Sequence, residues 1–219
     1  MAFAGFPERA LDFYEGLAAD NTKAYWSDHR AVYDECVAGP LRALLDALGP
    51  EFGEAKVFRP YRDVRFSRDK SPYKTQAAAV VQEGSDIGQG RYVALSAAGL
   101  EAGGGFHHTA PDQVRRWREA VAGDRWGSPL AAEVAALRAE GWVVEGEQLV
   151  RVPKPWDAGH PRADLLRLKT VTAVLRFPPE PWLSTPEALD RVAGAWRRVG
   201  PLLDWLGQHV GPSREPSRR

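Results

Sequence analysis

The sequence predicts an α+β fold, a single domain in which N-terminal and C-terminal helices pack on a largely antiparallel sheet. Apolar side chains recur at three- and four-residue spacing through residues 1–56, whereas the middle of the chain holds short strand-like runs between turn-rich segments. The 219 residues are enough to bury a sizeable core. We expect one domain over residues 1–210 and a disordered polar tail over residues 211–219.

The N-terminal segment is predicted to form three helices. Asn21 is expected to cap the second helix, because its side chain can accept a hydrogen bond from a free backbone N–H. Gly39-Pro40 should begin the third helix and Gly49 should end it, since proline at the first helical position loses no hydrogen bond. Residues 1–56 hold ten acidic and five basic side chains, so these helices are expected to form an acidic layer.

Strands are predicted over residues 57–66, 77–82, 91–97 and 100–106, with a turn over residues 83–90. Within the last of these strands, Gly103-Gly104-Gly105 would allow a bulge or a close approach of another backbone. Alternation in the first strand assigns its side chains to two faces. One face would carry Phe58, Arg62, Val64 and Phe66, and the other Arg59, Tyr61, Asp63 and Arg65.

The C-terminal half is predicted to add helices, a hairpin and one more strand. Helices should begin at Pro111 and at Ser128-Pro129, and Gly141 should end the second of them. The remaining expected elements are a hairpin over 142–152, a loop over Pro153–Pro161, a helix over 163–169, a strand over 171–177 and a helix from Pro186 that breaks at Gly200-Pro201. The length of the proline-rich loop makes it a candidate ligand-facing segment.

A basic segment, Val57–Lys74, stands out in a chain whose net charge is zero. It holds six basic and two acidic side chains, a local net charge of +4. Arginine grips phosphate or carboxylate with two parallel hydrogen bonds, and lysine adds a point charge. The candidate ligand-binding residues are Arg59, Arg62, Asp63, Arg65, Lys70, Tyr73 and Lys74.

Two alternatives to an anion site stay open for this segment. Its arginines could pair with Asp63, Asp69 and acids of the N-terminal helices, which would make the segment a structural ion network in a non-catalytic interaction module. It could also bind single-stranded nucleic acid, with Tyr61, Tyr73 and Trp26 as stacking platforms.

Other polar residues are weaker candidates. Asn21, Trp26, Arg30 and His160 could stand beside the anion site, although aromatic residues at helical spacing usually belong to a core. His160, with Asp157 and Arg162, offers an acid–base group, but capping of the loop explains these residues equally well. His107-His108 is a poor metal pair, because adjacent side chains on a strand point to opposite faces. We expect no metal and no cofactor.

The basic segment also carries a resemblance to a known family. Its spacing Arg59-x-x-Arg62-Asp63-x-Arg65-Phe66-x-x-Asp69-Lys70-x-x-Tyr73-Lys74 resembles the signature of DUF2461, a family of bacteria and some fungi. The likeness extends over most of the chain, although Thr22 stands where the family usually has a second asparagine. The resemblance implies a domain of mixed helix and sheet and brings no activity, so whether the protein is an enzyme stays open.

Composition indicates the expected cellular location and partners of the protein. Cys36 is the single cysteine, so no internal disulfide or multi-cysteine metal site can form, and we expect a cytoplasmic protein. We expect no targeting peptide and no membrane span, because no apolar run approaches about 18 residues. The zero net charge disfavours a dedicated duplex-binding protein. An anionic small molecule is the expected partner, and the sequence does not indicate an oligomeric state.

Overall fold

A computed structural model describes residues 2–65, 67–82, 88–107 and 109–214 of the chain. These residues adopt an α+β fold, which confirms the predicted class. Their contacts group them into two compact units. The first unit comprises Met1–Val81, Tyr92–Ala102 and Arg176–Ala195, and the second comprises Gln82–Arg91, Gly103–Leu175 and Trp196–Arg219. The extent of the predicted domain, residues 1–210, stays a prediction.

Six strands within the described residues form an antiparallel sheet in the order β1-β2-β3-β4-β6-β5. They are β1 (Ala55–Val57), β2 (Gln76–Gln82), β3 (Gln89–Ser96), β4 (Gly99–Phe106), β5 (Val143–Glu145) and β6 (Val171–Phe177). Four of the predicted strands are confirmed, at β2, β3, β4 and β6. The predicted turn over 83–90 lies largely outside the described residues, because 83–87 are not described.

The predicted hairpin over residues 142–152 is wrong, because β5 pairs with β6 instead of with the residues that follow it. Val143 lies opposite Val174 in this antiparallel pair. Gly146 then lies so close to β6 that a Cβ atom there would be 2.0 Å from the carbonyl oxygen of Thr170. The glycine that suggested a turn therefore permits close contact with a distant segment.

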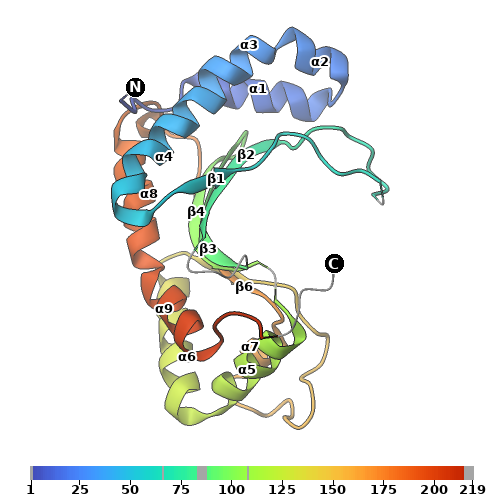
Figure 1. Ribbon diagram of the computed structural model, residues 1–219, viewed down its shortest axis with the longest axis vertical. Coiled ribbons are helices and arrows are strands. Elements are labelled where there is room, and N and C mark those ends of the chain that lie inside the picture. Colours follow the sequence, from blue (N-terminus) through green and yellow to red (C-terminus); the bar gives the residue numbers. More distant parts are fainter. Residues whose placement is uncertain (1, 66, 83–87, 108, 215–219) are drawn as a thin grey trace. The chain divides into compact units, whose positions relative to one another are not determined.

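The N-terminal helices and the end of β6 belong to the first unit. Its helical elements are α1 (Glu8–Ala19), α2 (Lys23–Asp28), α3 (Arg30–Val32), η1 (Tyr33–Ala38), α4 (Gly39–Phe52), η2 (Pro181–Ser184) and most of α8 (Glu187–Arg198). The buried residues of α1 are Ala10, Phe13, Tyr14 and Leu17, at the spacing of one helical face. In Figure 1 the chain leaves β1 as a long hairpin that runs beside α2 before it returns as β2.

The third helix, α4, begins at Gly39 as predicted, but its predicted end at Gly49 is wrong. Helical structure continues from α3 through the wider turn of η1 into α4, and Gly39 keeps right-handed helical angles. Because Pro40 has no N–H to donate, a wider helical turn before it loses no hydrogen bond from this residue and costs little free energy. Pro50 continues α4 beyond Gly49, and Gly53, with a φ of +94°, follows its last residue.

The second unit is built around α5 (Pro111–Ala122), α6 (Asp124–Ala139), α7 (Ala163–Arg167) and α9 (Gly200–His209). Figure 1 shows these four helices gathered together. α8 (Glu187–Arg198) ends before α9 begins, as the Gly200-Pro201 signal predicted. α6 begins at Asp124, so the predicted start at Ser128-Pro129 is wrong and Pro129 lies inside the helix. No helix in the described ranges has the length and apolar character needed to cross a membrane.

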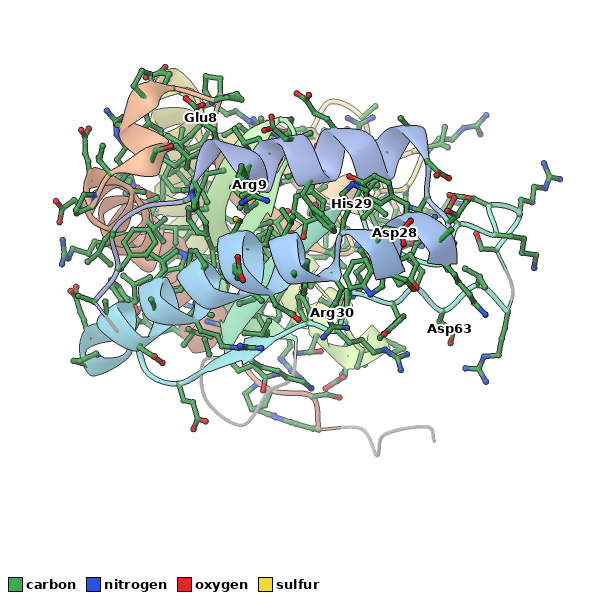
Figure 2. All side chains as sticks on the ribbon, turned by 90° about the horizontal axis from the view of Figure 1, so that it is seen from above. Glu8, Arg9, Asp28, His29, Arg30 and Asp63 are labelled. Atoms are coloured by element: carbon green, nitrogen blue, oxygen red, sulfur yellow. The ribbon has the colours of Figure 1, made fainter. Side chains whose placement is uncertain are left out.

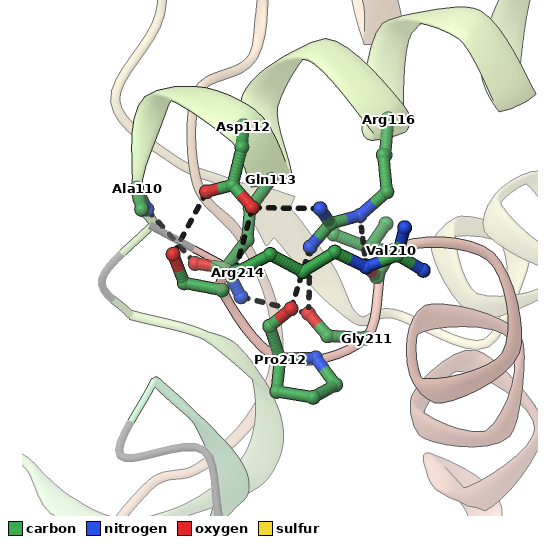
Figure 3. Close-up of polar contacts among 9 residues, drawn as sticks. Ala110, Asp112, Gln113, Arg116, Val210, Gly211, Pro212 and Arg214 are labelled. Carbon is green, nitrogen blue, oxygen red and sulfur yellow. Dashed lines mark hydrogen bonds and ion pairs between the residues drawn. The ribbon is translucent and has the colours of Figure 1, made fainter. Parts of the chain in front are cut away.

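The end of the described chain is attached to α5 (Figure 3). The carboxylate of Asp112 accepts hydrogen bonds from the Arg214 backbone N–H at 2.9 Å and from the Arg116 guanidinium at 2.7 Å. Arg116 also donates to the carbonyl oxygen of Pro212 at 2.7 Å. The structure thus holds the beginning of the segment predicted to be a disordered tail, and residues 215–219 lie outside the described residues.

We expect Asp112→Asn to melt at a lower temperature than the wild type at pH 7, by a gap that narrows in acid. The backbone hydrogen bond from Arg214, together with Arg116, holds the pKa of Asp112 below its ordinary value. A depressed pKa stabilises the fold above the unfolded-state pKa, about 4, and this stability is lost as pH falls through the lower folded-state value. Thermal unfolding between pH 7 and pH 2 measures the difference in melting temperature between the two proteins.

Asp204→Asn is the matched control, because Asp204 is an exposed carboxylate of the same unit and its substitution should change the melting temperature little at any pH. A gap between Asp112→Asn and the wild type that stayed constant from pH 7 to pH 2 would contradict the role of the ionised carboxylate.

Candidate functional site

The basic segment forms a hairpin rather than the predicted strand, and residues 57–74 are called the basic hairpin below. Regular pairing with β2 ends at Val57, and a single isolated bridge joins Tyr61 to Tyr73 further along. Pro60 and Pro72 lack an N–H and can only accept, from Lys74 at 2.8 Å and Arg62 at 2.9 Å. The continuous ladder that a strand needs is therefore interrupted. Phe66, assigned to one face of that strand, lies outside the described residues.

The base of the hairpin is anchored to the N-terminal helices through Tyr73. The side-chain amide of Asn21 accepts from the Tyr73 backbone N–H and donates to its carbonyl oxygen, both at 3.0 Å. The ring of Trp26 stacks on the ring of Tyr73, with centroids 4.3 Å apart and planes 6° apart. Tyr73 and Trp26 are both buried. These two predicted site residues therefore pack against each other.

Asn21 does not cap α2, and that prediction is wrong. Thr22 is the capping residue, because its hydroxyl accepts from the Tyr25 backbone N–H at 3.2 Å. The amide of Asn21 is used to bind the backbone of Tyr73, which lies 52 residues further along the chain. Thr22 thus caps the helix locally, and its neighbour Asn21 makes the long-range contact.

Arg30 lies beside this aromatic contact. Its guanidinium is 5.8 Å from the ring centroid of Trp26, and it forms an exposed ion pair with Asp34 at 2.8 Å. Figure 2 shows Arg30 on the helix next to the hairpin and Asp63 on the hairpin itself, while Arg9 lies at the opposite end of α1. Arg30 thus lies near the base of the basic hairpin, and its place beside a ligand stays a prediction.

Two arginines of the hairpin are neutralised by acids of the hairpin itself. Arg62 pairs with Asp69, and Arg65 binds both oxygens of Asp63, with a shortest N···O distance of 2.7 Å. The hydrogen bonds from Arg65 lower the pKa of Asp63, and those from Arg62 and then Ser71 lower the pKa of Asp69. These pairs fix the end of the hairpin, as the structural alternative expected for two of its basic residues.

Lys70 contributes to the same local structure, because its ammonium donates to the carbonyl oxygen of Val64 at 3.0 Å. Val64 and Arg62 are partly buried, while Tyr61, Asp63 and Arg65 are exposed, so this part of the predicted alternation is seen. Arg62, Arg65 and Lys70 thus each have a partner within about seven residues of sequence, whereas Arg68 forms no ion pair with a carboxylate in the described ranges.

Arg59 and Lys74 differ from the paired arginines. Within the described ranges neither forms an ion pair with a carboxylate. Both lie at the base of the hairpin, next to β1 and β2. The Lys74 ammonium lies 5.2 Å from the ring centroid of Phe58. Burial, and after it the positive charge of Arg59, holds the pKa of Lys74 below its ordinary value. Two mutually repelling cations thus lie near each other, and Asp63, a described acid that feels the charge of Arg59, is already paired with Arg65.

Exposed apolar side chains belong to the same segment as these two cations. Val57, Phe58 and Tyr61 are among the exposed large apolar side chains, with exposed fractions of 42%, 37% and 47%. Phe58 was assigned to the same face as Arg62, and its exposure was missed because the alternation is lost at Pro60. A polar hollow of about 410 Å³ also opens here, on the side of Lys74 and Arg62. Its other polar lining residues include Asn21, Asp69, Ser71, Thr75 and Gln76.

The acid–base group of the proline-rich loop lies in the second unit and serves the loop itself. Asp157 accepts from the Gly159 backbone N–H at 2.7 Å, and His160 accepts from the Arg162 backbone N–H at 3.1 Å through Nδ1. Both contacts are those of a loop cap. His160 was expected beside the basic segment, and its described contact is with Arg162.

Metal ligands do not gather in the described part of the chain, where no group of three or more His, Cys, Asp or Glu side chains could hold an ion. His108, half of the histidine pair, lies outside the described residues. His107 lines a separate cavity of the second unit.

Comparison with known proteins gives one match. A family model described as "Conserved hypothetical protein (DUF2461)" covers residues 9–205, and no curated protein or solved structure matches the chain.

Proposed function

The chain belongs to the DUF2461 family of conserved hypothetical proteins, and we propose that it binds a phosphorylated organic anion through the basic hairpin. The observation that carries this proposal is the pairing pattern of the hairpin. Arg62 and Arg65 form ion pairs with carboxylates, whereas Arg59 and Lys74 form no ion pair among the described residues. Like charges held together cost free energy that an anion bound between them would recover.

The neighbours of Arg59 and Lys74 suit the rest of such a ligand. A guanidinium can bind a phosphate through two hydrogen bonds, and the ammonium adds a point charge. The exposed rings of Phe58 and Tyr61 can cover an apolar or planar part of the molecule, so an organic phosphate uses more of the surface than free phosphate does. The hydroxyls of Ser71 and Thr75 line the adjoining hollow.

The two alternatives are favoured unequally. A structural network accounts for Arg62, Asp63, Arg65 and Lys70, whose partners lie within the hairpin. Single-stranded nucleic acid was expected to stack on three rings, of which Trp26 and Tyr73 stack on each other and are buried. Tyr61 is the exposed ring of the three. An organic phosphate needs only this one exposed platform.

We expect an organic phosphate to raise the melting temperature of the wild-type protein, and we expect Arg59→Ala/Lys74→Ala to reduce this shift. A ligand at about 100 times its dissociation constant stabilises by about 2.7 kcal/mol, or roughly 5–10 °C for a chain of this size. The probes are ATP, a sugar phosphate and inorganic phosphate, each measured against the ligand-free form of the same variant.

Arg9→Ala is the matched control, because Arg9 is an exposed arginine at the far end of α1 (Figure 2). It should keep the shift in full. An equal shift in the double variant, or no shift of the wild type with any of the phosphates, would contradict the proposal. A short single-stranded oligonucleotide that binds with steep salt dependence would instead favour the nucleic-acid alternative.

A further inference from the structure

We propose that the second unit contains a separate binding site for an aromatic anion, meaning a planar ring that carries one phosphate or carboxylate. The site is a cavity of about 700 Å³, within the range of small-molecule sites. Three segments line it: residues 107 and 109–119 from the end of β4 into α5, residues 147–156 after β5, and residues 169–170 before β6. The segment Pro153–Pro161, expected to face a ligand, contributes Lys154, Pro155 and Trp156.

The cavity is positively charged. Four basic side chains line it, namely Arg115, Arg118, Lys154 and Lys169, against the two acids Glu119 and Glu147. Lys169 and Glu147 neutralise each other through an ion pair at 2.5 Å. The other three cations form no ion pair with a carboxylate in the ranges that the structure describes. An anionic ligand would therefore supply charge that the lining lacks.

Arg118 is the cation best prepared for such a ligand. Its Nε donates to the carbonyl oxygen of Leu166 at 3.2 Å, which fixes the side chain across from α5 to α7. The two terminal amino groups have no acceptor among the described residues, and Arg118 is one of the residues that line the cavity. The side chain is partly buried, and burial lowers the pKa of Arg118. A guanidinium held by one nitrogen keeps its remaining donors for a planar oxyanion, with little rotamer entropy left to lose.

Trp156 supplies the second half of the site. Its indole is half-buried at the cavity, and it stacks on no other ring and on no cation in the described part of the chain. The turn that holds it is closed by a hydrogen bond from the Trp156 backbone N–H to the carbonyl oxygen of Pro153 at 3.2 Å. A half-buried aromatic face without a partner is suited to a planar ring, which would stack on it while its acidic group reaches the arginine.

The test measures binding of AMP, ribose 5-phosphate and benzoate by calorimetry in the Arg59→Ala/Lys74→Ala background, which removes the site proposed on the basic hairpin. We expect AMP and benzoate to bind more tightly than ribose 5-phosphate. Trp156→Ala should weaken the binding of AMP and of benzoate about tenfold and leave the binding of ribose 5-phosphate unchanged. Arg118→Gln should weaken the binding of all three probes, and so should Lys154→Ala, a substitution at an exposed residue of the loop.

Arg151→Ala is the matched control, because Arg151 is an exposed cation that precedes the loop and does not line the cavity. It should bind every probe as the background protein does. Absence of binding in this background, or affinities that Arg118→Gln and Lys154→Ala leave unchanged, would overturn the proposal. If Arg118→Gln fails to fold, Lys154→Ala and Trp156→Ala decide the outcome, and the hairpin proposal stands or falls separately on its own variants.

Discussion

Arg162→Ala is expected to destabilise the protein by about 3–5 kcal/mol, the largest loss we expect from a single truncation. The side chain is 6% exposed. Its Nε donates to the carbonyl oxygen of Val121 at 2.6 Å, and a terminal nitrogen donates to that of Ala122 at 2.8 Å. The same terminal nitrogen pairs with Asp124 at 2.8 Å.

The position of these acceptors explains the size of the effect. Val121 and Ala122 are the last residues of α5, where a helix leaves carbonyl oxygens without internal partners. The positive charge of Arg162 also lies at the negative end of the helix dipole. Because α6 begins after Gly123 alone, solvent has little access to these carbonyls, and alanine would leave them buried without donors.

Thermal unfolding should show a melting temperature about 10 °C lower for Arg162→Ala. Arg138→Ala is the matched control, since Arg138 pairs with Asp164 at 3.1 Å in the same unit but its side chain is 47% exposed. An exposed pair contributes at most about 1 kcal/mol. Equal losses for the two variants would refute the capping role of Arg162.

The regular elements were largely predictable because their signals are local. The spacing of Trp117 and Val121 marks the buried face of α5, and the β-branched run in residues 171–177 gives β6. Such patterns depend on the period of a helix or strand and not on what packs against it. Boundaries were less predictable, because proline lies inside α4 and α6 where adjacent structure supports the helix.

Roles of single polar residues could not be predicted, because their partners are distant in sequence. Asn21 suits a helix cap by type, yet it binds Tyr73, and Arg162 was grouped with the candidate base His160, yet it binds the end of α5. Within the basic hairpin, by contrast, the ion-pair partners could be predicted. Asp63 and Asp69 lie close in sequence to the arginines that they neutralise, so the paired residues follow from spacing, whereas the surplus charge of Arg59 depends on the fold.

Gly103→Ala is expected to destabilise the protein by about 2–3 kcal/mol, and its melting temperature should fall by roughly 5–10 °C. A Cβ atom at Gly103 would lie 2.0 Å from the carbonyl oxygen of Ala173, and one at Gly105 would lie 2.1 Å from that of Val171. Both contacts are with the backbone of β6, the neighbour of β4 in the sheet. A backbone oxygen cannot rotate away as a side chain can, so the added methyl group must push the strands apart. The predicted close approach at the glycine run is thereby confirmed.

Gly194→Ala distinguishes this steric cause from the general effect of replacing glycine. Gly194 is exposed within α8, and a Cβ atom there would meet nothing within 4 Å. Because glycine is the more flexible residue in the unfolded chain, alanine should stabilise this helix by about 0.5–1 kcal/mol. The same substitution should therefore have opposite signs at the two positions. If urea unfolding showed Gly103→Ala to be as stable as Gly194→Ala, the strands β4 and β6 could not approach as closely as described, and the glycine run would need another explanation.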